Sequence, residues 1–490
     1  MRKLEINPEN WKFWLIVAFL LKFVVFIFFI LFFSTKPDDI INIKGFIGYI
    51  SNDTSSYIQP IENLIHHKDF SFLFQYRMFG YGLPYYLLRF VFESGTSLNI
   101  IIFIQYIFAS ISLYLLALFA FRIVNRFKIF IITFLGYFLF PIISFYDIAA
   151  LTESFTSSFM LISVFLLVYK RTTFNIVIIG ILLTWMAFLR PVCFPLFLLF
   201  FLYFIIKDYK KGILHLIRYS ILFFLPLILF EGVWIAGNYH YKNKINLTTP
   251  TIFHPVYLNE KMHSMDMIHF LQSIGEEWEN NVWFYSNTKN CPYDKNIFTS
   301  KFNKDTLINM KKDILIAQDG LTSFNNAISD SIRIAKNIQI KKKLKEYTNS
   351  VKMEKKIIYY FYSPLKFLSR LIFSSSTYRM FGEYNTTNKW LLVFRYFVDF
   401  CFWVTQILSF LFIIILIINH NLNAPFLLIS LILIYFYFIH AIIFKSNDFR
   451  YLIPIITFEI LYSFCLINML KQKIFIEIFK KRNILHINSN

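Results

Sequence analysis

The residues best suited to chemistry in this chain stand in short polar segments between long apolar runs, and the first such segment holds Asp53 and Arg77. A carboxylate at a bilayer surface, partly withdrawn from water, has a shifted pKa, so Asp53 is suited to accept a proton from a hydroxyl nucleophile. The guanidinium of Arg77 offers a planar set of donors to a phosphate. Loop capping and solvation are the alternative explanation for both residues.

Three later polar sites carry residues of the same kinds. Glu153 stands where an apolar run begins, a position in which a carboxylate also serves to cap a helix. Arg190 lies between two apolar runs, and a charge at membrane depth indicates function unless the side chain extends to the interface. Asp448 stands between Lys445 and Arg450, with which it could simply form ion pairs. Residue type alone leaves both explanations open at each site.

The composition defines what must position these residues. The chain has 490 residues, of which 57% are hydrophobic and 16% charged, and its mean hydropathy is +0.55. A soluble domain averages about 25% charged residues, so this chain lacks the polar surface to cover itself in water. A soluble enzyme, a disordered protein and a DNA-binding module are therefore excluded, and we expect no nucleic-acid partner. With only 14 Pro and 13 Gly, the helices should be mostly unbroken.

Apolar runs of membrane-spanning length predict an all-α polytopic membrane protein with about ten transmembrane helices. The runs cover residues 12–33, 99–122, 128–146, 152–169, 174–189, 192–206, 213–236, 394–418, 424–443 and 449–470. Every second loop except 419–423 is rich in Lys and Arg, which predicts that both termini face the cytoplasm. The polar segments with the candidate residues then all lie on the outer face.

Three parts follow from this topology. Residues 1–236 form a transmembrane module that includes an interfacial first outer loop, 34–98. Residues 237–393 form one α-rich domain on the outer face, and its aromatic stretch near 357–374 is expected to lie in the interface between membrane lipids and water. Residues 394–490 form the last spans and a basic cytoplasmic tail.

The order of these motifs resembles that of GT-C class polytopic glycosyltransferases, in the group related to protein mannosyltransferases and the aminoarabinose transferase of lipid A. The matching motifs are Asp53 with Tyr57, Arg77 with Gly80-Tyr81 and Pro84, Gln105, Thr152-Glu153-Ser154, Gly180 with Arg190-Pro191, and Arg450-Tyr451 with Pro454. The resemblance covers residues 10–236 well and the end of the chain loosely.

The resemblance implies that a hexose or pentose is transferred from a polyprenyl-phosphate donor to an acceptor hydroxyl, with inversion, on the outer face of the bacterial inner membrane. It makes Asp53 the base, and the acceptor a lipid, a glycan or a protein. The expected ligands of the donor phosphate are Arg77, Arg190, Lys445 and Arg450, and the expected substrate-binding residues are Tyr57, Tyr81, Glu153, Asp448 and Tyr451.

No cofactor is required for this chemistry, because basic side chains can neutralise a leaving monophosphate. Some relatives use a divalent cation, for which Asp38, Asp39 and Asp53 would supply oxygen ligands. A lipid-linked glycan polymerase or ligase is an alternative function, since it would use the same kind of donor. A lipid or glycan transporter or flippase fits less well, because the spans are almost free of acidic residues near their centres.

Overall fold

The computed structural model divides the chain into two compact units. The structure describes residues 7–33, 43–74, 77–243, 245, 247, 262–277, 282–286, 290–317, 329–374, 389–419, 423–445 and 448–487. The first unit comprises Met1–Thr248, Ser375–Phe436 and Arg450–Asn490, and the second comprises Thr249–Ser374 and Tyr437–Phe449. Each unit is described by itself.

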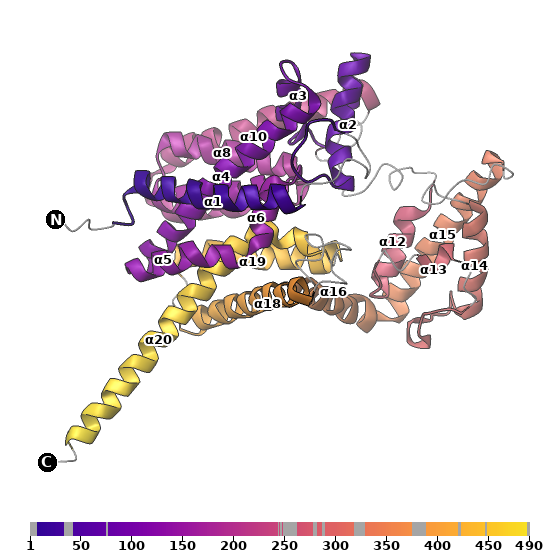
Figure 1. Cartoon of the computed structure of the whole chain (residues 1–490). Coiled ribbons are helices and arrows are strands. Elements are labelled where there is room, and N and C mark those ends of the chain that lie inside the picture. Colours follow the sequence, from indigo (N-terminus) through magenta and orange to yellow (C-terminus); the bar gives the residue numbers. More distant parts are fainter. Residues whose placement is uncertain are drawn as a thin grey trace. The chain divides into compact units, whose positions relative to one another are not determined.

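The first unit is a bundle of apolar helices (Figure 1). Its helices are α1 (Trp11–Phe33), α2 (Asn52–His67), α3 (Gly82–Arg89), α4 (Ser94–Val124), α5 (Phe127–Gly136), α6 (Pro141–Ile148), α7 (Glu153–Tyr169), α8 (Thr173–Leu189), α9 (Leu196–Asp208), α10 (Ile213–Lys242), α18 (Lys389–Ile418), most of α19 (Ala424–Phe438) and α20 (Ile456–Ile487). Helix α4 packs against α1, α5 and α7, while α8 packs against α7 and α10.

The membrane-protein class is confirmed by the length and apolar character of these helices. Among the described residues, seven helices are long and apolar enough to cross a membrane, and an eighth is added if one bent pair counts as a single span. Large apolar side chains such as Leu31, Leu214 and Ile228 point outward and are more than half exposed. Exposed apolar side chains of this kind are expected where lipid is the solvent.

The expected run at 128–146 is a helix with a sharp break. Phe127–Leu139 and Pro141–Ile148 meet at 64°, so this run is an exception among helices that were expected to be mostly unbroken. Pro141 is the first residue of α6, a position that tolerates a missing N–H, whereas a proline inside a continuous helix would remove a backbone hydrogen bond. The other nine expected runs are largely helical, although α7 and α8 have only 17 residues each and α9 has 13.

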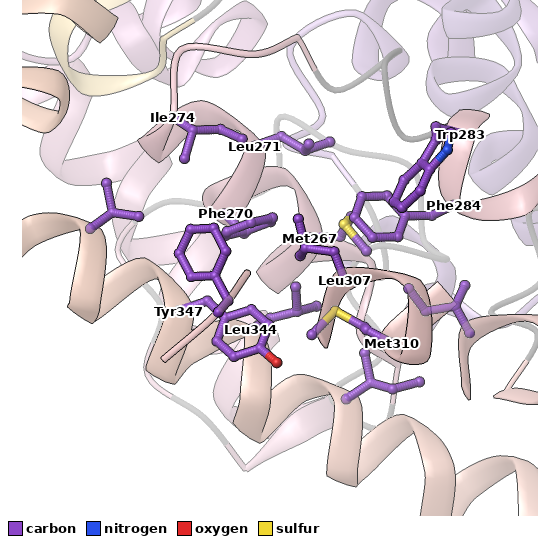
Figure 2. Packing of buried hydrophobic residues seen from close by; sticks show 14 of the residues in the cluster. Met267, Phe270, Leu271, Ile274, Trp283, Phe284, Leu307, Met310, Leu344 and Tyr347 are labelled. Carbon is purple, nitrogen blue, oxygen red and sulfur yellow. The ribbon is translucent and has the colours of Figure 1, made fainter. Parts of the chain in front are cut away.

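The second unit has its own hydrophobic core, formed between helices α12 (Ser264–Ser273), α13 (Val282–Tyr285), α14 (Lys304–Ala317) and α15 (Asp330–Glu354). Phe270 lies against Phe302 and Tyr347 at this core, with ring centroids 5.3 and 5.9 Å away. Figure 2 shows the aromatic and aliphatic side chains of this cluster converging between the helices. A π-helical segment (Ile358–Tyr362) and α16 (Ser363–Phe373) complete the main part of the unit.

Candidate functional site

A turn between α6 and α7 is the frame on which the site is built. Short backbone pairing fixes this turn to the segment before α2: the Tyr49 N–H donates to the Ile148 carbonyl at 2.9 Å, and the Ala150 N–H donates to the Tyr49 carbonyl at 3.0 Å. The Thr54 hydroxyl, in the first turn of α2, donates to the Ala150 carbonyl at 3.1 Å. The start of α2 and the start of α7 are therefore held side by side.

Asp53, in the first turn of α2, accepts from two arginines that are far apart in the sequence. Its Oδ1 accepts from Arg77 Nη2 at 2.9 Å, and its Oδ2 accepts from Arg450 Nη1. Arg450 stands near the start of the 3-10 segment Phe449–Ile455, which leads into α20. One carboxylate thus joins the first polar loop to the start of the last span.

One tyrosine contacts Arg77, and a second tyrosine packs against the first. The guanidinium carbon of Arg77 lies 4.4 Å from the ring centroid of Tyr57, and Arg77 Nη1 donates to the Tyr57 hydroxyl at 2.5 Å. Tyr81 packs its ring 5.4 Å from that of Tyr57 and donates to the side-chain oxygen of Gln105 at 3.2 Å. Burial raises the pKa of both phenols, so neither tyrosine ionises near neutral pH.

The loop that carries Arg77 and Tyr81 is pressed against the end of α8. A Cβ on Gly80 would collide with the backbone of Phe188, so only glycine permits this close approach. The Trp185 indole N–H donates to the Gly80 carbonyl at 2.9 Å. These contacts fix the direction in which Arg77 leaves the backbone.

A second carboxylate, Glu153, holds the other arginines. Glu153 is the first residue of α7 and is 2% exposed, and its Oε1 accepts from Arg190 Nη2 at 3.1 Å and lies 3.8 Å from Arg450 Nε. The ring of Tyr451 lies close to both cations, with its centroid 5.4 Å from the guanidinium carbon of Arg190 and 5.3 Å from that of Arg450. Arg450 therefore bridges the two carboxylates.

The side chains of the cluster differ in how deeply they are buried, and together they carry an excess of positive charge. The Asp53 and Arg77 side chains are 27% and 20% exposed, whereas those of Arg190 and Glu153 are 9% and 2% exposed. Three guanidinium groups face two carboxylates, which leaves one net positive charge when all are ionised. Arg190 Nη1 is buried and has no hydrogen-bond partner among the described residues. A net positive charge together with a buried donor that has no partner favours the binding of an anion.

The structure thus brings together eight of the sequence-predicted site residues: Asp53, Tyr57, Arg77, Tyr81, Glu153, Arg190, Arg450 and Tyr451. Lys445 and Asp448 belong to the second unit instead. There the Lys445 ammonium lies 4.3 Å from the Tyr359 ring centroid, and burial lowers the pKa of this lysine to about 8.

The predicted oxygen ligands for a cation are only partly described. Asp38 and Asp39 lie outside the described residues. Among the residues that are described, no group of three or more His, Cys, Asp and Glu side chains could hold a metal ion.

A buried ion pair that the sequence reasoning missed supports the turn before α7. Lys22, in α1, is 1% exposed and donates to Asp147 and, at 3.0 Å, to the Ser144 hydroxyl. Asp147 also accepts from the Ser154 hydroxyl at 2.7 Å, which links the pair to the residue after Glu153. A lone lysine near the middle of an apolar run was the available signal, since charges at membrane depth need a partner.

Comparisons of this chain with protein-family models, with curated proteins and with solved structures gave no match.

Proposed function

We propose that this protein is a membrane glycosyltransferase that moves a sugar from a polyprenyl-phosphate donor to an acceptor hydroxyl. The observation that carries the proposal is the convergence of Arg77, Arg190 and Arg450 around Asp53 and Glu153 within a helical membrane protein. A lipid phosphate sits at the membrane interface and needs cationic donors that are held in place, and a carboxylate beside them can serve a hydroxyl nucleophile. The resemblance of the motifs to GT-C enzymes supports the same reaction.

In the resting cluster both carboxylate oxygens of Asp53 accept from arginines, so neither is available to the acceptor hydroxyl. The donor phosphate competes with Asp53 for Arg77 and Arg450, and the buried Nη1 of Arg190 supplies a further donor. Binding of the donor thus releases Asp53 toward the acceptor. Coupling of this kind would make the base available only when the donor is present.

The transfer itself is a single displacement. Asp53 takes the proton of the acceptor hydroxyl, whose oxygen bonds to the anomeric carbon of the sugar as the bond from that carbon to the phosphate oxygen breaks. The phosphate leaves with the bonding electrons, and the arginines stabilise its added negative charge. Glu153 fixes the positions of Arg190 and Arg450 in this scheme.

The proposal extends to setting and partners. The reaction would take place on the outer face of the bacterial inner membrane, with both termini of the chain in the cytoplasm. The acceptor would be a lipid, a glycan or a protein. No residue of the cluster demands a cofactor, while a divalent cation remains compatible with the reaction.

A binding measurement tests the phosphate site before the sugar is known. The purified protein in lipid nanodiscs is titrated with a short-chain polyprenyl phosphate and, in parallel, with the matching polyprenol, which lacks the phosphate. We expect the phosphate to bind at least about tenfold more tightly, because one charge-assisted hydrogen bond contributes about 1.5–3 kcal/mol. Equal affinities for the two lipids would contradict the proposal.

A further inference from the structure

Three buried polar residues follow one face of α10 and have no part in the mechanism above. Glu231, Trp234 and Asn238 are 7%, 0% and 0% exposed, and their spacing of three and four residues places them on one side of the helix. Helix α10 is one of the candidate membrane spans. A polar stripe therefore lies inside the bundle, where most neighbours are apolar.

These side chains have polar atoms without partners. Both carboxylate oxygens of Glu231, the indole nitrogen of Trp234 and the side-chain oxygen of Asn238 are buried and have no hydrogen-bond partner among the described residues. The Asn238 amide nitrogen is satisfied, because it donates to the Trp234 carbonyl at 2.9 Å. The stripe thus offers acceptors at both ends and one donor between them.

Such groups destabilise a fold unless something binds them. A buried polar group without a hydrogen bond costs free energy, and an ionisable residue inside a membrane span is a candidate for function. Leucine at 231 and phenylalanine at 234 would fill similar volumes without this cost. The retained polar atoms therefore point to a ligand that enters the stripe.

The stripe lies against the loop of the proposed active site. The Trp234 ring is 6.0 Å from that of Phe79, which is two residues from both Arg77 and Tyr81. Trp234 also packs 5.5 Å from the ring of Phe74. One side of this loop thus faces Asp53 and the other side faces α10.

The pattern of donors and acceptors selects the chemistry of the ligand. An anion without donors would leave the acceptors of Glu231 and Asn238 unsatisfied, and a cation without acceptors would leave the Trp234 N–H unused. Hydroxyl groups donate and accept, so they match all three positions. The stripe separates them by about 4.5 and 6 Å along the helix axis, a spacing that several hydroxyls on one ring can bridge.

We propose that Glu231, Trp234 and Asn238 bind the hydroxyl groups of the sugar on the lipid donor. This inference rests on the proposed glycosyltransferase function and adds a site for the sugar to the site for the phosphate. The indole N–H of Trp234 donates to one hydroxyl of the sugar, and Glu231 and Asn238 accept hydrogen bonds from others.

The test compares a bare carrier with a loaded one. Undecaprenyl phosphate and the same lipid carrying glucose, mannose or 4-aminoarabinose are titrated into the protein in nanodiscs. The gain is the factor by which a sugar raises the affinity above that of the bare carrier, and the sugar with the largest gain is used. Glu231→Leu and Trp234→Phe should each reduce that gain about three- to tenfold, the loss expected for one hydrogen bond. Affinity for the bare carrier should not change, and Glu231→Leu should be at least as heat-stable as the wild type.

Matched controls and contrary results are available. Glu9→Gln and Trp11→Phe change the same residue types away from the stripe. Glu9 is ion-paired with Arg122, and Trp11 is 55% exposed. Both variants should keep the full gain. An undiminished gain in Glu231→Leu and Trp234→Phe would overturn the sugar site, as would a wild type that binds the bare carrier but gains nothing from any of these sugars. A wild type that binds neither form would overturn the proposed function itself.

Discussion

Replacement of Arg190 by lysine separates the two tasks assigned to this side chain. Arg190 Nη2 donates to Glu153 at 3.1 Å, while Nη1 is buried and has no partner among the described residues. Lysine keeps the positive charge but has a single nitrogen, which can stay with Glu153 and cannot also reach a phosphate. Arg190→Lys should therefore fold and insert normally and lose one contact to the donor.

The size of the loss follows from the bond removed. A hydrogen bond between a guanidinium and a phosphate contributes about 1.5–3 kcal/mol, which corresponds to an affinity about 10- to 150-fold weaker. Arg190→Ala is the less informative change, because it would also leave Glu153 buried with Arg450 Nε 3.8 Å away as its nearest remaining cation.

The assay is titration of bare polyprenyl phosphate into nanodiscs that hold the wild type, Arg190→Lys or Arg218→Lys. Arg218 is exposed near the start of α10, so its substitution should leave the affinity unchanged. Wild-type affinity in a well-folded Arg190→Lys protein would refute the role of Nη1 as a phosphate donor.

Two further predictions concern charges outside the arginine cluster. Lys22→Met should reduce the yield of folded protein in detergent, because an unpaired buried Asp147 costs about 3–5 kcal/mol. Adding Asp147→Asn should restore most of the yield. Equal yields for the single and double variants would argue against this pair. Burial lowers the pKa of Lys445 to about 8, against about 10.4 in an unfolded chain. Between about pH 8 and about pH 10.4 the unfolded state therefore binds more protons than the folded state. The stability of the second unit should rise as the pH rises through this range. Hydrogen exchange of the backbone of Ser363–Phe373, corrected for the intrinsic effect of pH, should slow from pH 8 to pH 10 in the wild type and change less in Lys445→Met. The same dependence of the exchange rate on pH in both proteins would count against this pKa shift.

The helices could be predicted from the sequence because spanning a bilayer imposes a length that apolar runs reveal directly. Even the short helices α7 and α8 coincide with the runs expected at 152–169 and 174–189. Pro141 inside the run 128–146 was a signal for a break, whereas the angle of 64° depends on tertiary packing and could not be predicted.

The residues of the cluster could be selected by type and position, whereas their pairings depend on the fold. Asp53 contacts Arg450, which is 397 residues away, and no local spacing encodes that contact. Lys445 is only five positions before Arg450, yet it packs on Tyr359 in the second unit. Lys22 within an apolar run indicates a buried partner, but that partner, Asp147, is 125 residues away and no local spacing identifies it.

Sugar transfer by the Asp53→Asn variant tests the central claim most directly. Proteoliposomes are supplied with polyprenyl-phosphate-linked sugars and an extract of cell-envelope acceptors, and release of the bare carrier lipid is measured for the wild type, Asp53→Asn and Asp69→Asn. Asp69 stands in the same polar segment, where it accepts from Ser71 and takes no part in the arginine cluster, so Asp69→Asn is the matched control. The account predicts transfer by the wild type and Asp69→Asn and a loss of about 100-fold or more in Asp53→Asn, which should still bind the bare carrier. Full transfer by Asp53→Asn, or no transfer by the wild type from any of the loaded carriers, would contradict it.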